Sequence, residues 1–204
     1  MFFRARRRSS EDGNQMTNLT KRAMADALKK RLGRHTLEHI TIQDVTDEAN
    51  VSRKTFYYHF HDIYDLVEWM LMDECKSLAQ SREHEGFWMR DVASVLSYAA
   101  ENRRWMMNIY ASMDRDQLER ILRKIVSPLV EESFDQAVNG RAVNEADRSF
   151  VLEVLTYGIT GLFLSWVGEG MENNAAFLQD RLGYFFTDSI QYMADRCVAD
   201  AEQK

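Results

Sequence analysis

The scarcity of chain-breaking residues constrains this sequence most, because its 204 residues include one proline, Pro128, and nine glycines. Folds with many strands need turn residues roughly every 8–12 positions. Apolar residues instead recur at helical spacing, between clear breaks such as Asn139-Gly140 and Gly168-Glu169-Gly170. We therefore predict an all-α protein of about nine helices, without a repeat or a coiled coil.

Apolar periodicity and capping residues predict where these helices lie. A first helix is expected from Thr20 to Leu32, ended by Gly33. Thr41 and Asp44 form a capping-box-like start for a short second helix, and Ser52 can cap a third helix that runs through Phe60. Asp62 can cap a fourth helix. The other helices are expected at about 62–82, 86–101, 103–112, 115–139, 144–168 and 174–199.

The third of these helices carries the main functional signal. Phe56 and Phe60, at i and i+4, would anchor it to the first two helices. The outward groups would then be Arg53, Lys54, Thr55, Tyr57, Tyr58 and His59. Such groups bind base edges in a major groove and the flanking phosphates. The N-terminal residues of a groove helix reach the bases, so this segment is a candidate DNA-reading helix. The alternative is an ordinary solvated helix face.

The charge distribution agrees with a DNA-facing end, although the net charge of −6 does not. Residues 1–66 hold 12 Lys and Arg against 9 Asp and Glu (+3), and the remainder holds 14 against 23 (−9). Residues 1–16, with Arg4, Arg6, Arg7 and Arg8, are expected to be a disordered basic arm. This arm could reach into a minor groove, or it could be an irrelevant tail preceding a true start at Met16.

The segment Thr41–Phe60, TIQDVTDEANVSRKTFYYHF, resembles the DNA-binding signature of the TetR family of transcription regulators. The likeness extends over about residues 19–68. It implies a homodimer that binds a palindromic operator in double-stranded DNA, usually as a repressor released by a small-molecule effector. It assigns phosphate contacts to Tyr57 and His59 and base reading to Gln43, Arg53, Lys54 and Thr55. The expected DNA-binding set is Thr41, Gln43, Ser52, Arg53, Lys54, Thr55, Tyr57, Tyr58 and His59.

Three positions depart from the family pattern. Asn50 stands where glycine is usual in the turn, and asparagine is the next-best residue for a left-handed backbone. Thr46 replaces alanine at a close helix contact, so its hydroxyl must find a backbone acceptor. Ile63 replaces a phosphate-binding lysine, although the amides of the following helix would remain for a phosphate. We expect a lower affinity for DNA and a weaker salt dependence than is usual in the family.

The resemblance implies that the last two helices form the dimer interface. Their apolar stripes are Leu152, Leu155, Ile159, Leu162 and Phe163 in one, and Phe177, Leu182, Phe185, Phe186, Ile190 and Met193 in the other. Residues 157–166, YGITGLFLSW, with 168–171, GEGM, resemble the subgroup of dihydroxyacetone-kinase-type regulators. The predicted parts are therefore a disordered arm at 1–16, a helix-turn-helix domain at 17–66, and a dimerisation and effector-sensing domain at 67–204.

Aromatic and methionine side chains in the middle helices are candidates for an adaptable effector pocket, although at helical spacing they also suit a plain core. The candidate ligand-binding residues are Trp105, Met106, Tyr110, Met113, Phe163 and Trp166. No charged constellation among them indicates a particular ligand.

Other chemistry is not indicated. The sequence has no Gly-rich phosphate loop, no Ser-His-Asp arrangement and no Cys-rich metal spacing, so we expect neither an enzyme nor a metal or cofactor site. His35 and His39 lie in an expected loop. Cys75 and Cys197 suit a cytoplasmic protein, and the longest apolar run, Gly158 to Val167, is too short for a bilayer.

Two functional hypotheses remain from the sequence. The first is a sequence-specific transcription regulator, expected to be a repressor released by an effector. The second is a helical interaction module that kept the fold but binds a partner protein rather than DNA, which the loss of lysine at Ile63 would permit.

Overall fold

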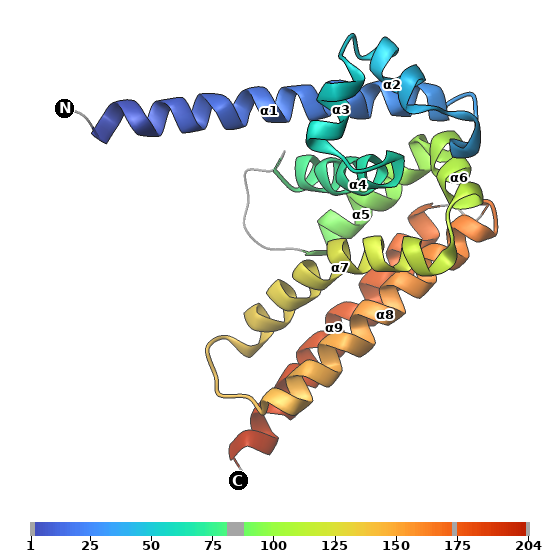
Figure 1. Cartoon of the computed structure of the whole chain (residues 1–204). Coiled ribbons are helices and arrows are strands. Elements are labelled where there is room, and N and C mark those ends of the chain that lie inside the picture. The colour runs from blue at the N-terminus through green and yellow to red at the C-terminus, as the bar shows by residue number, and fades with distance from the viewer. Residues whose placement is uncertain (1–2, 81–87, 173–174, 203–204) are drawn as a thin grey trace. The chain divides into compact units, whose positions relative to one another are not determined.

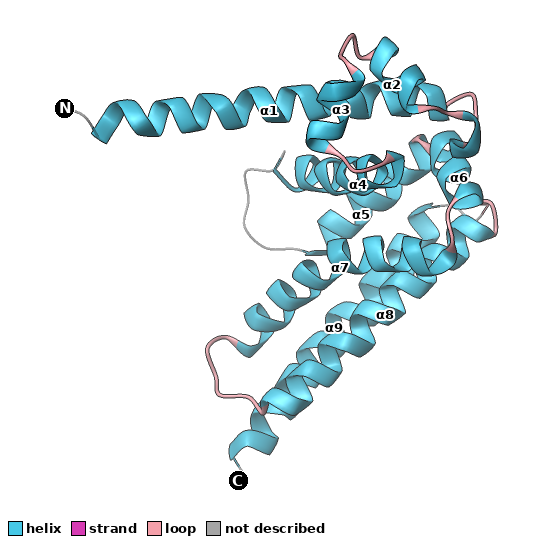
Figure 2. Ribbon diagram, in the orientation of Figure 1, coloured by secondary structure: helices cyan, strands magenta, loops and turns pink. Residues whose placement is uncertain are grey.

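The computed structural model describes residues 3–80, 88–172 and 175–202, and every regular element within these ranges is helical (Figures 1 and 2). The predicted all-α fold is confirmed. The chain divides into two compact units, Met1–Glu74 and Cys75–Lys204, with the division inside α4 (Ile63–Gln80) rather than at the expected 66/67 boundary.

The N-terminal unit contains α1 (Phe3–Leu32), a 3-10 turn (Leu37–His39), α2 (Ile42–Glu48), α3 (Arg53–His59) and the beginning of α4. These helices meet in a small apolar core. Its fully buried side chains are Met24, Leu28, Leu32, Val45, Phe56, Leu66, Val67 and Met70.

Helix α1 begins much earlier than the sequence suggested. The helix starts at Phe3, so residues 3–16, expected to be unstructured, are helical. Arginine, glutamate, glutamine and methionine are good helix formers, and one glycine, Gly13, costs only about 1 kcal/mol. The docked turns from Thr20 to Leu32 provide the nucleus, so extension towards the N-terminus avoids the cost of nucleation.

The C-terminal unit contains five helices close to the expected ranges: α5 (Trp88–Glu101), α6 (Arg103–Ser112), α7 (Arg115–Val138), α8 (Glu145–Gly168) and α9 (Ala175–Glu202). Helix α7 packs on α8 and α9, and α5 packs on α9 (Figure 1). The core includes Leu96, Val130, Phe134, Leu155, Ile159, Trp166, Leu182 and Ile190.

Helices α7 and α8 form an antiparallel hairpin. Asn139, with φ of 53°, and Gly140, with φ of 74°, end α7 in the left-handed region. Asn144 then caps α8 by accepting a hydrogen bond from the Ala146 amide at 3.0 Å. An ion pair of 3.0 Å between Asp135 and Arg148 joins the two helices.

Helix α8 is apolar on the side that faces α7 and α9 and also on part of its outer side. Leu152, Leu155 and Ile159 are buried as expected, but Leu162 is exposed. Among the described side chains of this unit, the exposed large apolar residues are Phe150, Val154, Tyr157 and Leu162 on α8 and Tyr192 on α9. By length and composition α8 could cross a membrane, which differs from the expectation, but core helices of soluble proteins pass the same test. The side chains of Phe177, Phe185 and Phe186 lie outside the described residues.

Candidate DNA-binding surface

Helix α2 begins with the capping box that the sequence indicated. The Thr41 hydroxyl accepts a hydrogen bond from the Asp44 amide at 3.1 Å, and the Asp44 carboxylate accepts from the Thr41 amide at 2.9 Å. The Thr41 hydroxyl also donates to Asp44 at 2.6 Å. Aspartate therefore replaces the usual glutamate without loss of the reciprocal bonds.

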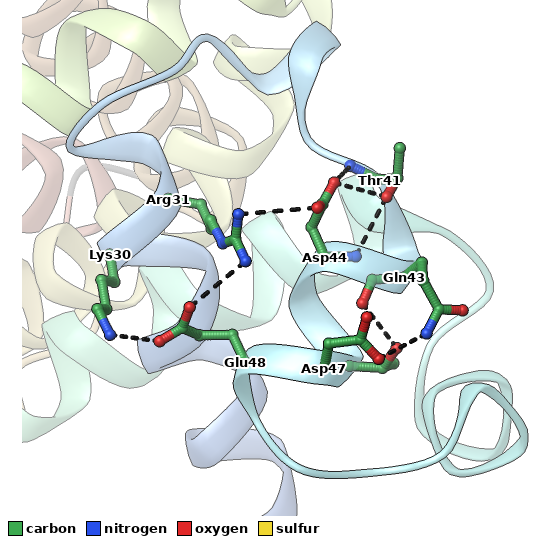
Figure 3. Close-up of polar contacts among 8 residues, drawn as sticks. Lys30, Arg31, Thr41, Gln43, Asp44, Asp47 and Glu48 are labelled. Atoms are coloured by element: carbon green, nitrogen blue, oxygen red, sulfur yellow. Dashed lines mark hydrogen bonds and ion pairs between the residues drawn. The ribbon is translucent and has the colours of Figure 1, made fainter.

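The remaining polar groups of α2 are also satisfied locally. Thr46 is fully buried, and its hydroxyl donates to the Gln43 carbonyl at 3.1 Å, which confirms the expected backbone acceptor. The Gln43 amide nitrogen donates to Asp47 at 2.6 Å, so this predicted base reader is held along the outer face of α2 (Figure 3).

The turn between α2 and α3 depends on Asn50. This residue has φ of 52°, the left-handed conformation expected of it, and the Val51 amide donates to the Thr46 carbonyl at 2.9 Å. Ser52 then caps α3 by accepting from the Thr55 amide at 3.0 Å, and the two hydroxyls lie 2.9 Å apart. These bonds fix the direction in which α3 starts.

Two phenylalanines hold α3 against the rest of the unit, as predicted. Phe56 and Phe60 are buried, with ring centroids 5.7 Å apart, and Phe60 also contacts Trp69 of α4 edge-on at 6.1 Å. Because Phe56 within this seven-residue helix and Phe60 at its C-cap are both buried, the opposite side of α3 faces solvent.

The outer side of α3 presents two cations and two phenols. Arg53 and Lys54 are exposed, Tyr57 is 53% exposed and Tyr58 is 80% exposed. Within the described residues, no carboxylate lies within 4.0 Å of Arg53 or Lys54. Thr55 and His59 are half-buried. The predicted residues of α3 are thus gathered on one short helix, whereas Thr41 and Gln43 lie on α2.

Four basic residues of α1 differ, because they are paired with acids. Arg22 binds Asp73 with bonds of 2.9 and 3.2 Å, and Lys29 binds Glu74, both on α4. Figure 3 shows the pairs with α2: Lys30 binds Glu48, and Arg31 lies 3.7 Å from Asp44 and 3.5 Å from Glu48. These cations fasten α1 to its neighbours, which leaves the cations of α3 available to an external anion.

His59 lies where α1 approaches the end of α3. Partial burial and the nearby charge of Lys21 lower the pKa of His59, which favours the neutral ring near pH 7, with one N–H to donate. The Lys21 ammonium lies 5.8 Å from the Phe60 ring centroid and 5.7 Å from that of Trp69. Sequence analysis missed this cation, because periodicity alone does not reveal which α1 residue reaches α3.

The N-terminus of α4 corrects one expectation. Its amides were expected to remain for a phosphate, but the Asp62 carboxylate accepts from the amides of Tyr64 at 2.8 Å and Asp65 at 2.9 Å. A carboxylate in this place repels an anion. His61, Asp62 and Asp65 together could hold a metal ion by proximity, but clusters of exposed acidic groups are common without one.

The candidate effector residues lie in or against the core of the C-terminal unit. Trp105, Met113 and Trp166 are buried, and Met106, Tyr110 and Phe163 are partly buried. The Trp105 indole donates to Asn102 at 2.9 Å, and a side chain at Gly168 would meet the Tyr110 hydroxyl at 2.6 Å. A surface pocket lies elsewhere, between α8 and α9, and is lined by Asp147, Phe150, Val151, Tyr192, Met193, Arg196 and Cys197.

Comparison with known proteins gives consistent matches. Residues 88–188 match the family model TetR_C_8, a transcriptional regulator C-terminal region. The HTH-type dhaKLM operon transcriptional activator DhaS of Lactococcus lactis subsp. lactis (strain IL1403) is 23% identical over 53% of this chain, and the match spans 61% of that relative's length.

Two solved structures share the fold. One, a dihydroxyacetone kinase operon activator DhaS, has a TM-score of 0.66 at 19% identity and covers 85% of this chain and 97% of its own. The other, a TetR transcriptional regulator from Streptococcus agalactiae 2603V, has a TM-score of 0.51 at 18% identity and covers 82% of this chain and 98% of its own.

Proposed function

Residues 88–188 make this chain a member of the TetR family of transcriptional regulators, and we propose that it binds a palindromic operator in double-stranded DNA as a homodimer. Helix α3 enters the major groove, with Arg53, Lys54 and Thr55 nearest the bases and Tyr57, Tyr58 and His59 towards the phosphates. The observation that carries this proposal is the pair of exposed cations, Arg53 and Lys54, at the capped start of a helix whose inner side is anchored by Phe56.

The second copy would cover the exposed apolar side of α8 and α9. A helix that is apolar around most of its circumference is usually buried on more than one side. Phe150 and Tyr192 are each 68% exposed in a single chain, and Val154 and Tyr157 continue the same side of α8. Two-fold pairing through this surface would give the dimer two copies of α3, one for each half-site. A two-fold symmetric protein binds an operator whose half-sites are related by the same symmetry, so the operator would be palindromic.

DNA binding is tested by fluorescence anisotropy with DNA from immediately upstream of the chain's own gene. We expect Lys54→Ala to weaken binding about tenfold and to lower the salt dependence by about one unit of slope. Lys124→Ala, which removes an exposed lysine from α7, is the charge-matched control. Equal binding by both variants would contradict the proposal. If the DNA causes no change in anisotropy and a partner protein co-purifies with the chain, the alternative of a protein-interaction module is favoured.

We further propose that the protein acts in the cytoplasm as a repressor. A small-molecule effector would release it from the operator. The aromatic and methionine side chains around Trp105 support an effector site. The relative DhaS is named an activator, so whether this protein represses or activates transcription needs its own test. Deleting the gene should raise expression of a reporter placed behind the operator. A fall in expression would identify an activator.

A further inference from the structure

Lys21 is the one cation among the described side chains of α1 that has no acidic partner. The other four bind carboxylates of α2 or α4, and they are Arg22, Lys29, Lys30 and Arg31. No carboxylate lies within 4.0 Å of the Lys21 ammonium among the side chains that the structure describes. The charge of Lys21 is therefore not used to fasten α1 to its neighbours.

Two aromatic rings hold this cation at the C-terminal end of α3. The Lys21 ammonium lies 5.8 Å from the ring centroid of Phe60, the C-cap of α3, and 5.7 Å from that of Trp69. Attraction to a ring face orients an ammonium but leaves its positive charge in place. The Lys21 side chain is only half-buried, which leaves part of it open to solvent.

The same end of α3 carries His59 and Tyr58. Partial burial and then the charge of Lys21 lower the pKa of His59, which indicates that the two groups are close. The Tyr58 ring lies edge-on to the His59 ring, with centroids 4.9 Å apart. Lys21 thus stands beside the two residues that the proposed function directs towards phosphates.

A DNA phosphate is the counter-charge that this end of α3 would meet. A seven-residue helix is about 10 Å long and the major groove is about 12 Å wide, so the end of α3 away from the base readers comes close to the backbone. The chain has no lysine or arginine between Lys54 and Lys76, so the end of α3 and the start of α4 lack such a cation of their own. Lys21 supplies one from α1.

We propose that Lys21 binds a phosphate of the operator backbone beside His59, as a DNA contact made by α1 rather than by α2 or α3. This inference rests on the proposed function, because it requires α3 to lie in the major groove. A phosphate contact carries no sequence information, so Lys21 should strengthen binding to operator and unrelated DNA alike.

The test is fluorescence anisotropy at several salt concentrations, with DNA from upstream of the gene and with a scrambled duplex of equal length. Lys21→Met keeps an apolar side chain over the two rings and removes the charge. We expect it to bind both duplexes about tenfold more weakly, with a slope of log affinity against log salt smaller by about one unit for each half-site. Lys21→Arg should keep the wild-type slope. Lys76→Met, which removes an exposed lysine from α4, is the matched control and should also keep it.

The outcomes separate this contact from the proposed function. If the wild type binds neither duplex, the proposed function fails, and the contact fails with it. If the wild type prefers the operator and Lys21→Met keeps the wild-type slope, only the contact is overturned.

A purely structural role for Lys21 gives a different result. A cation near the C-terminus of a helix also stabilises that helix, so a lower Tm and a weaker affinity with an unchanged slope would mean that Lys21 only supports α3. That result overturns the contact. If Lys21→Met does not fold, Lys21→Gln, which removes the charge and keeps a polar side chain, is judged by the same slope.

Discussion

Asn50 shows how one residue sets the direction of α3. Its backbone is left-handed, with φ of 52°, and its side chain is exposed without a hydrogen bond among the described residues. Its contribution is therefore conformational. A residue with a Cβ and no local hydrogen-bonding group costs roughly 1–2 kcal/mol in this conformation, whereas glycine adopts it freely.

Asn50→Ala should therefore lower the free energy of unfolding by about 1 kcal/mol, and Asn50→Gly should leave it close to the wild-type value. Urea unfolding followed by circular dichroism measures both. The Ala and Gly variants form a matched pair, because neither adds a side-chain contact. If they unfold at the same urea concentration, the turn does not need the left-handed conformation.

At the scale of the element, acids of α2 hold it to its neighbours. A hydrogen bond from the Thr41 hydroxyl lowers the pKa of Asp44, and one from Lys30 lowers the pKa of Glu48. A carboxyl whose pKa is lower in the folded state stabilises the fold above its unfolded pKa, near 4, and loses this effect as the pH falls through the folded value.

We expect the Tm of the protein to fall as the pH drops below about 4. The double variant Asp44→Asn with Glu48→Gln should start from a lower Tm near pH 7 and show a smaller fall, because it has fewer carboxyls to protonate. Melting curves between pH 7 and pH 3 measure the difference. If Tm falls with pH by the same amount in the wild type and the variant, these two carboxyls do not contribute to the loss of stability in acid.

Helix α4 offers a gain-of-function test at Ile63, where the family pattern has lysine. Ile63→Lys should strengthen DNA binding severalfold and steepen the salt dependence by about one unit of slope, because it adds a cation beside the phosphates. Ala111→Lys, at an exposed position of α6, controls for net charge. Unchanged binding by Ile63→Lys would mean that the start of α4 stays away from DNA.

The elements were predictable where local signals agree. The capping pairs at Thr41 and Ser52 and the i, i+4 anchors Phe56 and Phe60 located α2 and α3 closely. The start of α1 was not predictable, because polar helix-forming residues before Thr20 carry no apolar period. Asp62 was expected to cap α4, and its carboxylate does accept from the first amides of that helix. The position of Lys21 beside His59 was not foreseen, because it depends on a contact between elements.

At the scale of the whole molecule, the exposed side of α8 predicts self-association. Val154→Glu would place a charge in the middle of this apolar side, at a high cost if it is buried between two copies. We expect the variant to be monomeric by light scattering and to bind the operator at least about a hundredfold more weakly, because the two half-sites are then bound independently.

Ala111→Glu introduces the same charge at an exposed position of α6, outside the apolar side of α8 formed by Phe150, Val154 and Tyr157, and should remain dimeric. A dimeric Val154→Glu variant would show that copies meet through another surface.

The Asp62 carboxylate that caps α4 also affects how the protein is distributed between its operator and non-specific DNA. Bulk DNA competes with any operator through its backbone charge alone, and each cationic contact strengthens that competition. With isoleucine in place of the usual lysine at position 63, and with the Asp62 carboxylate over the first amides of α4, we expect this surface to bind non-specific DNA less tightly. More copies then remain free to search, and target choice rests more on the few groups at the beginning of α3.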